Sequence, residues 1–298
     1  MNRNYTIILM HEAVSPITHM EGVAGNVAVL MRHSTLYEGM QHRVPCLTGN
    51  ALRNRLLREP SAHLLKTRLG LYGKLSTHQD RFLTSGQERS VKGNSVDIGL
   101  MRRGYELMPH VRVLGGTLPT EVVTGRASVG FGVLSCRETK RDRAAIIPSD
   151  WGIEDRELLS YQSMIELRQY TRMSDDVETP LREGEKRERS MMPFSSYTVV
   201  SGSVFMQRID LANCRDIDAG MACAAIEMWD GTIGGQKARG HGRLRTRYAV
   251  MVDRSPIDAQ PMIDAYESHV ESRKREMIDW IFAAVGESTP KDLVDAAG

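Results

Sequence analysis

The segment GGQKARGHGRLRTRYAVMV, residues 234–252, combines glycines and basic side chains in a pattern suited to contact with phosphate. Glycines let a backbone approach a ligand closely, and successive N–H groups can form a concave anion site. Lys237 and Arg239 supply positive charge, and Arg243 is the first of three arginines that alternate along the strand expected next. Three interpretations follow: a nucleotide cofactor site, a nucleic-acid contact, or a tight turn before a strand.

A nucleotide cofactor does not fit this segment. Gly235 and Gly240 have the spacing of a Walker A loop, but His241 and Gly242 stand where Lys and Ser or Thr are required. The segment also follows a predicted helix and enters a strand, which is the reverse of a phosphate-binding loop. The RGHGRLRT portion instead loosely matches the RNP1 pattern of RNA-recognition domains, with a histidine at the aromatic position. The nucleic-acid contact predicted here comprises Lys237, Arg239, His241 and Arg243. A glycine turn followed by a solvated arginine face remains the alternative.

Two further segments are candidates for the same contact. PCLTGNALRNRLLRE, residues 45–59, predicts a helix whose free N-terminal N–H groups suit a phosphate. Its contact residues are expected to be Asn50, Arg53 and Arg55, unless the helix simply exposes its arginines. Residues 171–197 are polar and charged and predict a protruding hairpin or a solvated linker, with Met192 and Phe194 as apolar contacts at its base.

The composition fits a folded protein that contacts nucleic acid. The chain has 298 residues, 41% of them hydrophobic, and a net charge of +2. Of its 39 basic residues 31 are Arg, whose planar guanidinium matches phosphate and stacks on bases, although a GC-rich genome gives the same bias. The four cysteines lack CxxC spacing, and no signal or membrane-spanning segment is recognisable. We expect free thiols, a cytoplasmic location and no membrane partner.

Catalytic chemistry has little support in the sequence. A metal-free ribonuclease could use a histidine base, and four histidines lie near the N-terminus: His11, His19, His33 and His42. A metal-dependent nuclease needs clustered carboxylates, yet the first Asp in the chain is Asp80, and no HExxH motif occurs. We therefore expect no catalytic residue, no metal and no cofactor.

The elements that must position these residues alternate between strands and helices. The predicted elements follow the order β, α, a long excursion, β, β, α, β. The strands are expected at residues 5–10, 127–136, 196–211 and 244–252, and the helices after Gly49 and at 216–231. This order predicts an α+β fold: a ferredoxin-like, RRM-type βαββαβ palm with a partly helical insertion and a protruding thumb hairpin. The expected ranges are 1–60, 116–170 and 195–255 for the palm, 61–115 for the insertion, 171–195 for the thumb and 256–298 for a C-terminal helix packed on the palm.

Four segments in order resemble the RAMP superfamily of CRISPR-associated proteins, and within it the oligomeric backbone subunit of class 1 effector complexes, of the type IV kind. They are PCLTGNALRNRLLRE, VRVLGGTLPTEVVTGRASVGFGVLSC, RSMMPFSSYTVVSGSVFMQRIDL and the glycine-rich IGGQKARGHGRL. Tyr197 stands where many relatives have Glu, and Val113–Leu114 replaces their Leu-Phe. Backbone subunits that cut RNA use an Asp after the first strand, whereas the nearest comparable region here holds Asn26.

The resemblance implies a non-catalytic subunit that binds guide crRNA and stacks head to tail along its spacer. Further copies, other effector subunits, the target nucleic acid and an accessory helicase or nuclease would be its partners. A guide holder needs to grip phosphates without reading bases, which agrees with arginines, backbone N–H groups and apolar wedges in place of acids or nucleophiles. Two alternatives stay open: a CRISPR RNA-processing endonuclease of the same superfamily, and a monomeric single-stranded RNA-binding protein.

Overall fold

The central sheet places the first strand of the chain between two strands from its C-terminal half. The computed structural model describes residues 2–86, 97–118, 121–147, 151, 158–171, 193–285, 287–290 and 293. In it, β1 (Arg3–Ala13) pairs antiparallel with both β12 (Val204–Cys214) and β13 (Leu244–Val252). The sheet order is β14-β13-β1-β12-β9-β5-β4, and β8 also pairs with β12. The remaining strands are β14 (Ser255–Ile257), β9 (Gly132–Leu134), β8 (Ala127–Val129), β5 (Met40–Leu47) and β4 (Arg32–Tyr37).

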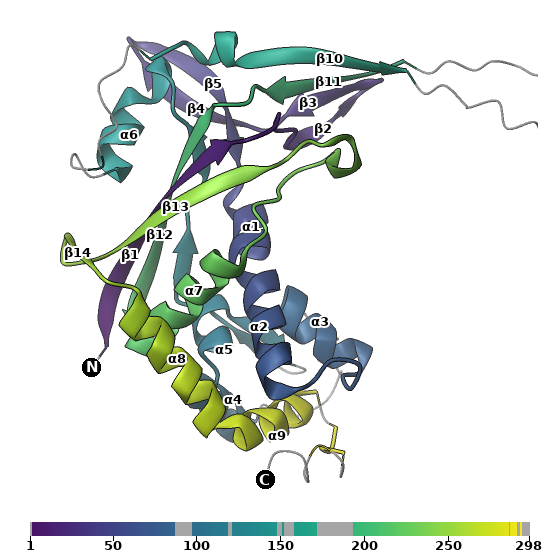
Figure 1. Ribbon diagram of the computed structural model, residues 1–298, viewed down its shortest axis with the longest axis vertical. Coiled ribbons are helices and arrows are strands. Elements are labelled where there is room, and N and C mark those ends of the chain that lie inside the picture. The colour runs from purple at the N-terminus through teal and green to yellow at the C-terminus, as the bar shows by residue number, and fades with distance from the viewer. Residues whose placement is uncertain are drawn as a thin grey trace, which may run out of the picture.

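This order is that of a βαββαβ unit, so the predicted α+β, ferredoxin-like fold class is confirmed. In chain order, β1, then β8 and β9, then β12, and finally β13 supply its strands. The helices after β5 and the helix α7 between β12 and β13 supply its two helical connections, and Figure 1 shows both on one side of the sheet.

The apolar run at the N-terminus forms β1 because both of its faces are buried. Tyr5, Ile7 and Leu9 face the helices and join the main hydrophobic core. Ile8 and Met10 face the other way and pack with the segment that ends α6 (Lys140–Ile146). Burial on both sides explains the absence of an apolar–polar alternation in this strand.

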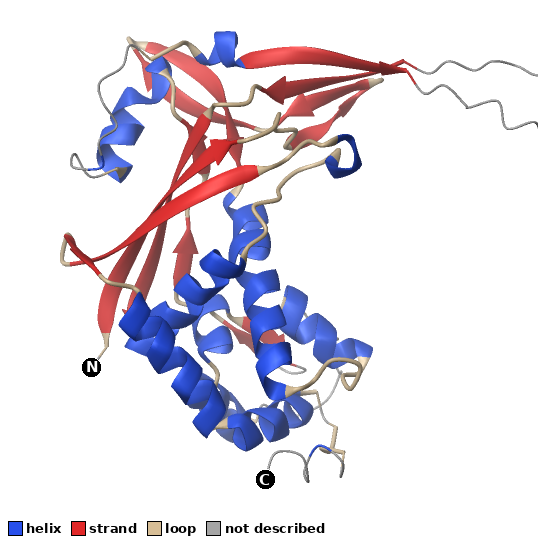
Figure 2. Cartoon of the chain, in the orientation of Figure 1, coloured by secondary structure: helices blue, strands red, loops and turns tan. Residues whose placement is uncertain are grey.

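The helical layer builds most of the core beneath the sheet (Figure 2). Its first helix continues from α1 (Gly49–Leu52) through a π-helical turn at Arg53–Arg58 into α2 (Glu59–Leu69). The other helices are α3 (Thr77–Ser85), α4 (Ile98–Leu107), α5 (Pro109–Leu114), α7 (Asp216–Met228), α8 (Gln260–Ser272) and α9 (Lys274–Ala284). We expected one C-terminal helix in residues 256–298; the structure has two, α8 packing on α7 and α9 on α4.

A second sheet lies at one end of the first, beside the loop that precedes β13 (Figure 1). Its order is β10 (Ile165–Thr171), β11 (Pro193–Val199), β3 (Val27–Leu30) and β2 (Met20–Ala24). β10 and β11 are antiparallel, and residues 172–192 between them lie outside the described residues, with most of the predicted thumb and Met192. A short hairpin of β6 (Gly116–Leu118) and β7 (Glu121–Val123) completes the strands described.

Candidate nucleic-acid interface

The glycine-rich loop between α7 and β13 is fixed along the segment that connects β1 to β2. Gly242 N–H donates to the Pro16 carbonyl at 2.9 Å, and Gly235 N–H donates to the Thr18 carbonyl at 2.7 Å. Gly234 and Gly242 both have positive φ. A Cβ on Gly234 would overlap the Thr18 carbonyl, and a Cβ on Gly242 would overlap the Ile233 carbonyl. These glycines are therefore required by the fold of the loop itself.

His241 lies beneath this loop and not on its surface. Its side chain is buried; one ring nitrogen lies 2.8 Å from Thr18 Oγ1 and the other 2.8 Å from the Tyr170 hydroxyl oxygen. Burial, helped by the charges of Arg168 and Arg239, lowers the pKa of His241 below its usual value. The expected RNP1-like surface position is corrected accordingly: both ring nitrogens are engaged within the protein, and His241 ties the loop to β10.

Arg239 stands at the surface above Tyr170, beside an open groove. Its guanidinium carbon lies 4.5 Å from the centre of the Tyr170 ring. The groove has a volume of about 320 Å³ and is lined by Met20, Val23, Asn26, Ala28, Phe194, Ser195, Gln236 and Arg239. Val23 and Phe194 are 65% and 38% exposed, so the groove offers apolar and aromatic surface next to a cation. Such a combination suits an unstacked nucleobase and its phosphate.

Lys237, two residues before Arg239, lies in a cluster of charges around Asp230. Lys237 Nζ donates to Thr232 Oγ1 at 2.8 Å, and the Thr232 hydroxyl and N–H donate to the Asp230 carboxylate. Burial alone would raise the pKa of Asp230, but these bonds and the charges of Lys237 and Arg55 outweigh it and lower the pKa. The structure thus brings Arg55 of the first helix close to the same carboxylate as Lys237.

The other predicted residues of the first helix have different positions. Thr48 caps α1 by accepting from Ala51 N–H, and Asn50 is exposed in its first turn. Arg53 is half-buried and donates to the Leu114 carbonyl, which Arg58 also contacts at 2.8 Å. Burial lowers the pKa of Arg53. The structure therefore gives Arg53 a role in holding α5, and its contact with RNA stays a prediction.

The Arg53→Ala variant is expected to lose about 1.5–3 kcal/mol of stability, because a hydrogen bond from a charged donor to the Leu114 carbonyl is removed. The Arg55→Ala variant should lose less than about 1 kcal/mol, since its ion pair with Glu59 at 2.7 Å is exposed. Chemical denaturation of both variants measures the difference. Equal losses in the two variants would contradict the inward role of Arg53.

Arg243 lies immediately before β13, and Arg245 and Arg247 lie on it. Arg243 is exposed, and its N–H donates to Ser15 Oγ at 2.9 Å. Arg245 and Arg247 are exposed too, while Thr246 between them faces the helices and contacts His11. Arg245 pairs with Glu12 across the sheet at 3.6 Å. No contact joins Arg243 to the residues of the groove among those the structure describes.

The histidines near the N-terminus do not form a cluster. His11 is fully buried, with Nε2 2.9 Å from Gln207 Oε1 and Nδ1 2.8 Å from Thr246 Oγ1. His19 Nε2 accepts from Thr48 N–H, His33 lies against Phe131, and His42 lies near Tyr37 and Tyr161. Within the described part of the chain, no group of three or more His, Cys, Asp or Glu side chains could hold a metal ion. No described helix is long and apolar enough to cross a membrane.

The buried histidines predict acid sensitivity. Burial lowers the pKa of His11 to about 4, so its neutral form is favoured in the folded state. Above about pH 6.5 His11 is neutral in both the folded and the unfolded state and costs the folded state nothing. As the pH falls from 6.5 toward 4, the free energy of unfolding decreases by about 3 kcal/mol because only the unfolded state binds the proton readily. Unfolding free energies measured across this range should show a shallower loss in His11→Gln than in wild type. Identical pH dependence would contradict the assignment.

Several residues of the groove had no sequence signal. Met20 and Val23 come from an edge strand whose five residues are all exposed, and Tyr170, under Arg239, comes from β10. They meet the glycine-rich loop only because the second sheet folds against it. Phe194 was predicted as an apolar contact at the base of the thumb, whereas no pattern in the sequence pointed to Met20, Val23 or Tyr170.

No protein-family model matches the sequence, and no curated protein matches it. Among solved structures, a chain of a protein described as "Type IV-B CRISPR Complex" resembles it with a TM-score of 0.58. The two chains share a fold. Their sequences are 17% identical, and the similarity covers 86% of this chain and 93% of the other. The likeness therefore extends over most of this chain and nearly all of the other.

Proposed function

We propose that this protein is a non-catalytic guide-RNA-binding subunit of a CRISPR effector complex. The groove beside Arg239 is the observation that carries the proposal. It joins an exposed cation, an aromatic ring and apolar surface at the end of the sheet, between the glycine-rich loop and the base of the predicted thumb. The similar fold of a CRISPR-complex chain supports the same assignment.

The chemistry of the groove suits a grip that is independent of sequence. Every base has a face that can stack on Phe194 or on a guanidinium, whereas reading a base requires fixed donors and acceptors. Lys237 lies on the glycine-rich loop, two residues before Arg239, and Arg55 lies on the first helix near the same carboxylate, Asp230. The charges of both side chains suit the phosphates next to a stacked base. In the free protein Lys237 donates to Thr232 and Arg55 pairs with Glu59, and both side chains would exchange these partners for phosphate.

Several copies are proposed to stack head to tail along the spacer of a guide crRNA and to present it for pairing with a target. Other effector subunits, and an accessory helicase or nuclease, would complete the assembly in the cytoplasm of a prokaryote. In this arrangement the protein needs no cofactor and carries out no reaction, because base pairing with the guide selects the target.

The purified protein mixed with two guide RNAs of unrelated spacer sequence, without metal, tests the proposal. Binding of equal affinity to both, with the RNA intact, is expected. Specific cleavage that is lost in His33→Ala or His42→Ala would favour the endonuclease alternative. Binding of a single copy at saturation would favour a monomeric single-stranded RNA-binding protein.

A further inference from the structure

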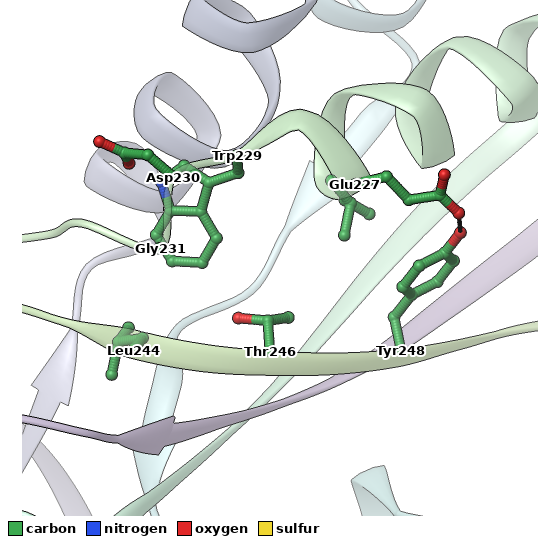
Figure 3. A pocket seen from close by; sticks show the side chains of 8 residues that line it. Glu227, Trp229, Asp230, Gly231, Leu244, Thr246 and Tyr248 are labelled. Carbon is green, nitrogen blue, oxygen red and sulfur yellow. Dashed lines mark hydrogen bonds between the residues drawn. The ribbon is translucent and has the colours of Figure 1, made fainter.

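A second pocket lies between the C-terminal end of α7 and the helix-facing side of β13 (Figure 3). Its volume is about 230 Å³, and its walls include Glu227, Trp229 and Asp230 from the end of the helix, with Thr246 and Tyr248 from the strand. A single water needs only about 10–15 Å³ of such space, so the pocket has room for a side chain.

The charge of the pocket favours a cation. No Lys, Arg or His lines it, whereas two carboxylates do. The last turn of α7, a helix of 13 residues, has no basic residue to offset the negative end of the helix dipole. Lys237 and Arg55 partly neutralise Asp230, which leaves Glu227 as the carboxylate available to an occupant. A phosphate would be repelled here.

The aromatic walls give this site a shape that suits a planar cation. The Tyr248 hydroxyl donates to Glu227 Oε1 at 2.6 Å, which fixes the carboxylate at the mouth of the pocket (Figure 3). The second oxygen of Glu227 has no hydrogen-bond partner among the described residues. Trp229 packs edge-on against His11, and its indole Nε1 is buried without a partner in the part of the chain described.

We propose that this pocket receives an arginine side chain from a neighbouring copy of the same chain. A guanidinium stacks on aromatic faces, pairs with a carboxylate through two N–H groups and is less strongly hydrated than an ammonium, so arginine fits better than lysine. Exposed arginines such as Arg247 and Arg254 make the chain itself a source of this group. The choice of a second copy rests on the proposed function, in which copies stack on RNA.

Binding of a capped arginine amide to the whole protein tests the pocket directly. The Trp229 indole N–H signal in NMR, assigned with Trp229→Phe, reports on it. The arginine amide should shift this signal in a saturable way, and citrulline amide, a neutral analogue of similar shape, should bind at least about tenfold more weakly. Glu227→Gln should weaken the arginine amide by a similar factor while keeping an acceptor for Tyr248. Glu271→Gln, an exposed acid-to-amide change on α8, serves as the control.

Sedimentation on guide RNA tests the source of the arginine. Glu227→Gln should lower the number of copies bound per RNA and leave the affinity of the first copy unchanged. In the NMR test, a Trp229 indole N–H signal that responds to AMP and not to the arginine amide would overturn the proposal. Wild-type protein that binds the amide but does not assemble on RNA would contradict the proposed function and the second copy as occupant. If wild-type protein assembles on RNA and Glu227→Gln assembles equally well, the pocket inference alone is contradicted.

Discussion

The double variant Lys237→Ala/Arg239→Ala is expected to bind single-stranded RNA at least about tenfold more weakly than wild type. Both side chains are exposed on the same turn of the glycine-rich loop, and Arg239 also borders the apolar groove. Each lost phosphate contact should reduce the slope of log affinity against log salt by about 0.7 on a single strand. Fluorescence anisotropy with labelled RNA at several salt concentrations measures both quantities.

The matched control is Arg102→Ala/Arg103→Ala, which removes two exposed arginines from α4. It changes the net charge of the protein by the same amount at a distance from the loop in sequence and fold. Its salt slope should stay near that of wild type. Equal losses in the two double variants would indicate a diffuse electrostatic effect, and a loss that varies with spacer sequence would contradict a grip on the backbone.

Gly242→Ala is expected to disrupt the loop, with a loss of roughly 2–4 kcal/mol in stability and most of the RNA affinity. Its φ of +86° disfavours any L side chain, and a Cβ there would overlap the Ile233 carbonyl. The Gly242 N–H bond to Pro16, which holds the loop, would be displaced as well. Thermal unfolding and RNA binding of the purified variant measure the two effects.

Gly240→Ala separates backbone strain from overlap. Gly240 has a similar φ of +81°, but nothing lies within 4 Å of the position of a Cβ. Its cost should therefore be only the strain of a left-handed residue, about 1–2 kcal/mol. If Gly240→Ala and Gly242→Ala were equally damaging, the close packing of the loop against its own backbone would not be the reason for its glycines.

The sequence predicted the order of the palm elements because the alternation of β13 and the apolar run of β1 are local features. The helix after Gly49 was also predicted, but the orientation of its arginines was not. A π-helical turn at Arg53–Arg58 departs from the 3.6-residue period, so Arg58 and part of Arg53 turn toward α5. Side-chain direction there depends on the helix type, which no residue pattern in this segment indicates.

The loop illustrates the same limit at the candidate site. Its glycines and its charged residues could be identified from spacing, and Lys237 and Arg239 do lie at the surface. His241 is buried because Thr18 and Tyr170, far from it in sequence, offer partners for both ring nitrogens. The groove itself depends on the docking of β2, β3 and β11 beside the loop, a tertiary arrangement that single-sequence periodicity does not encode.

The number of copies bound to guides of increasing spacer length tests the central claim most directly. We expect mass measurements on three guides, whose spacers are one, two and three times a unit length, to show copy numbers that rise in regular steps, with the RNA intact. A single copy on every RNA, or cleavage of the guide, would contradict the proposal of a non-catalytic subunit that stacks along it.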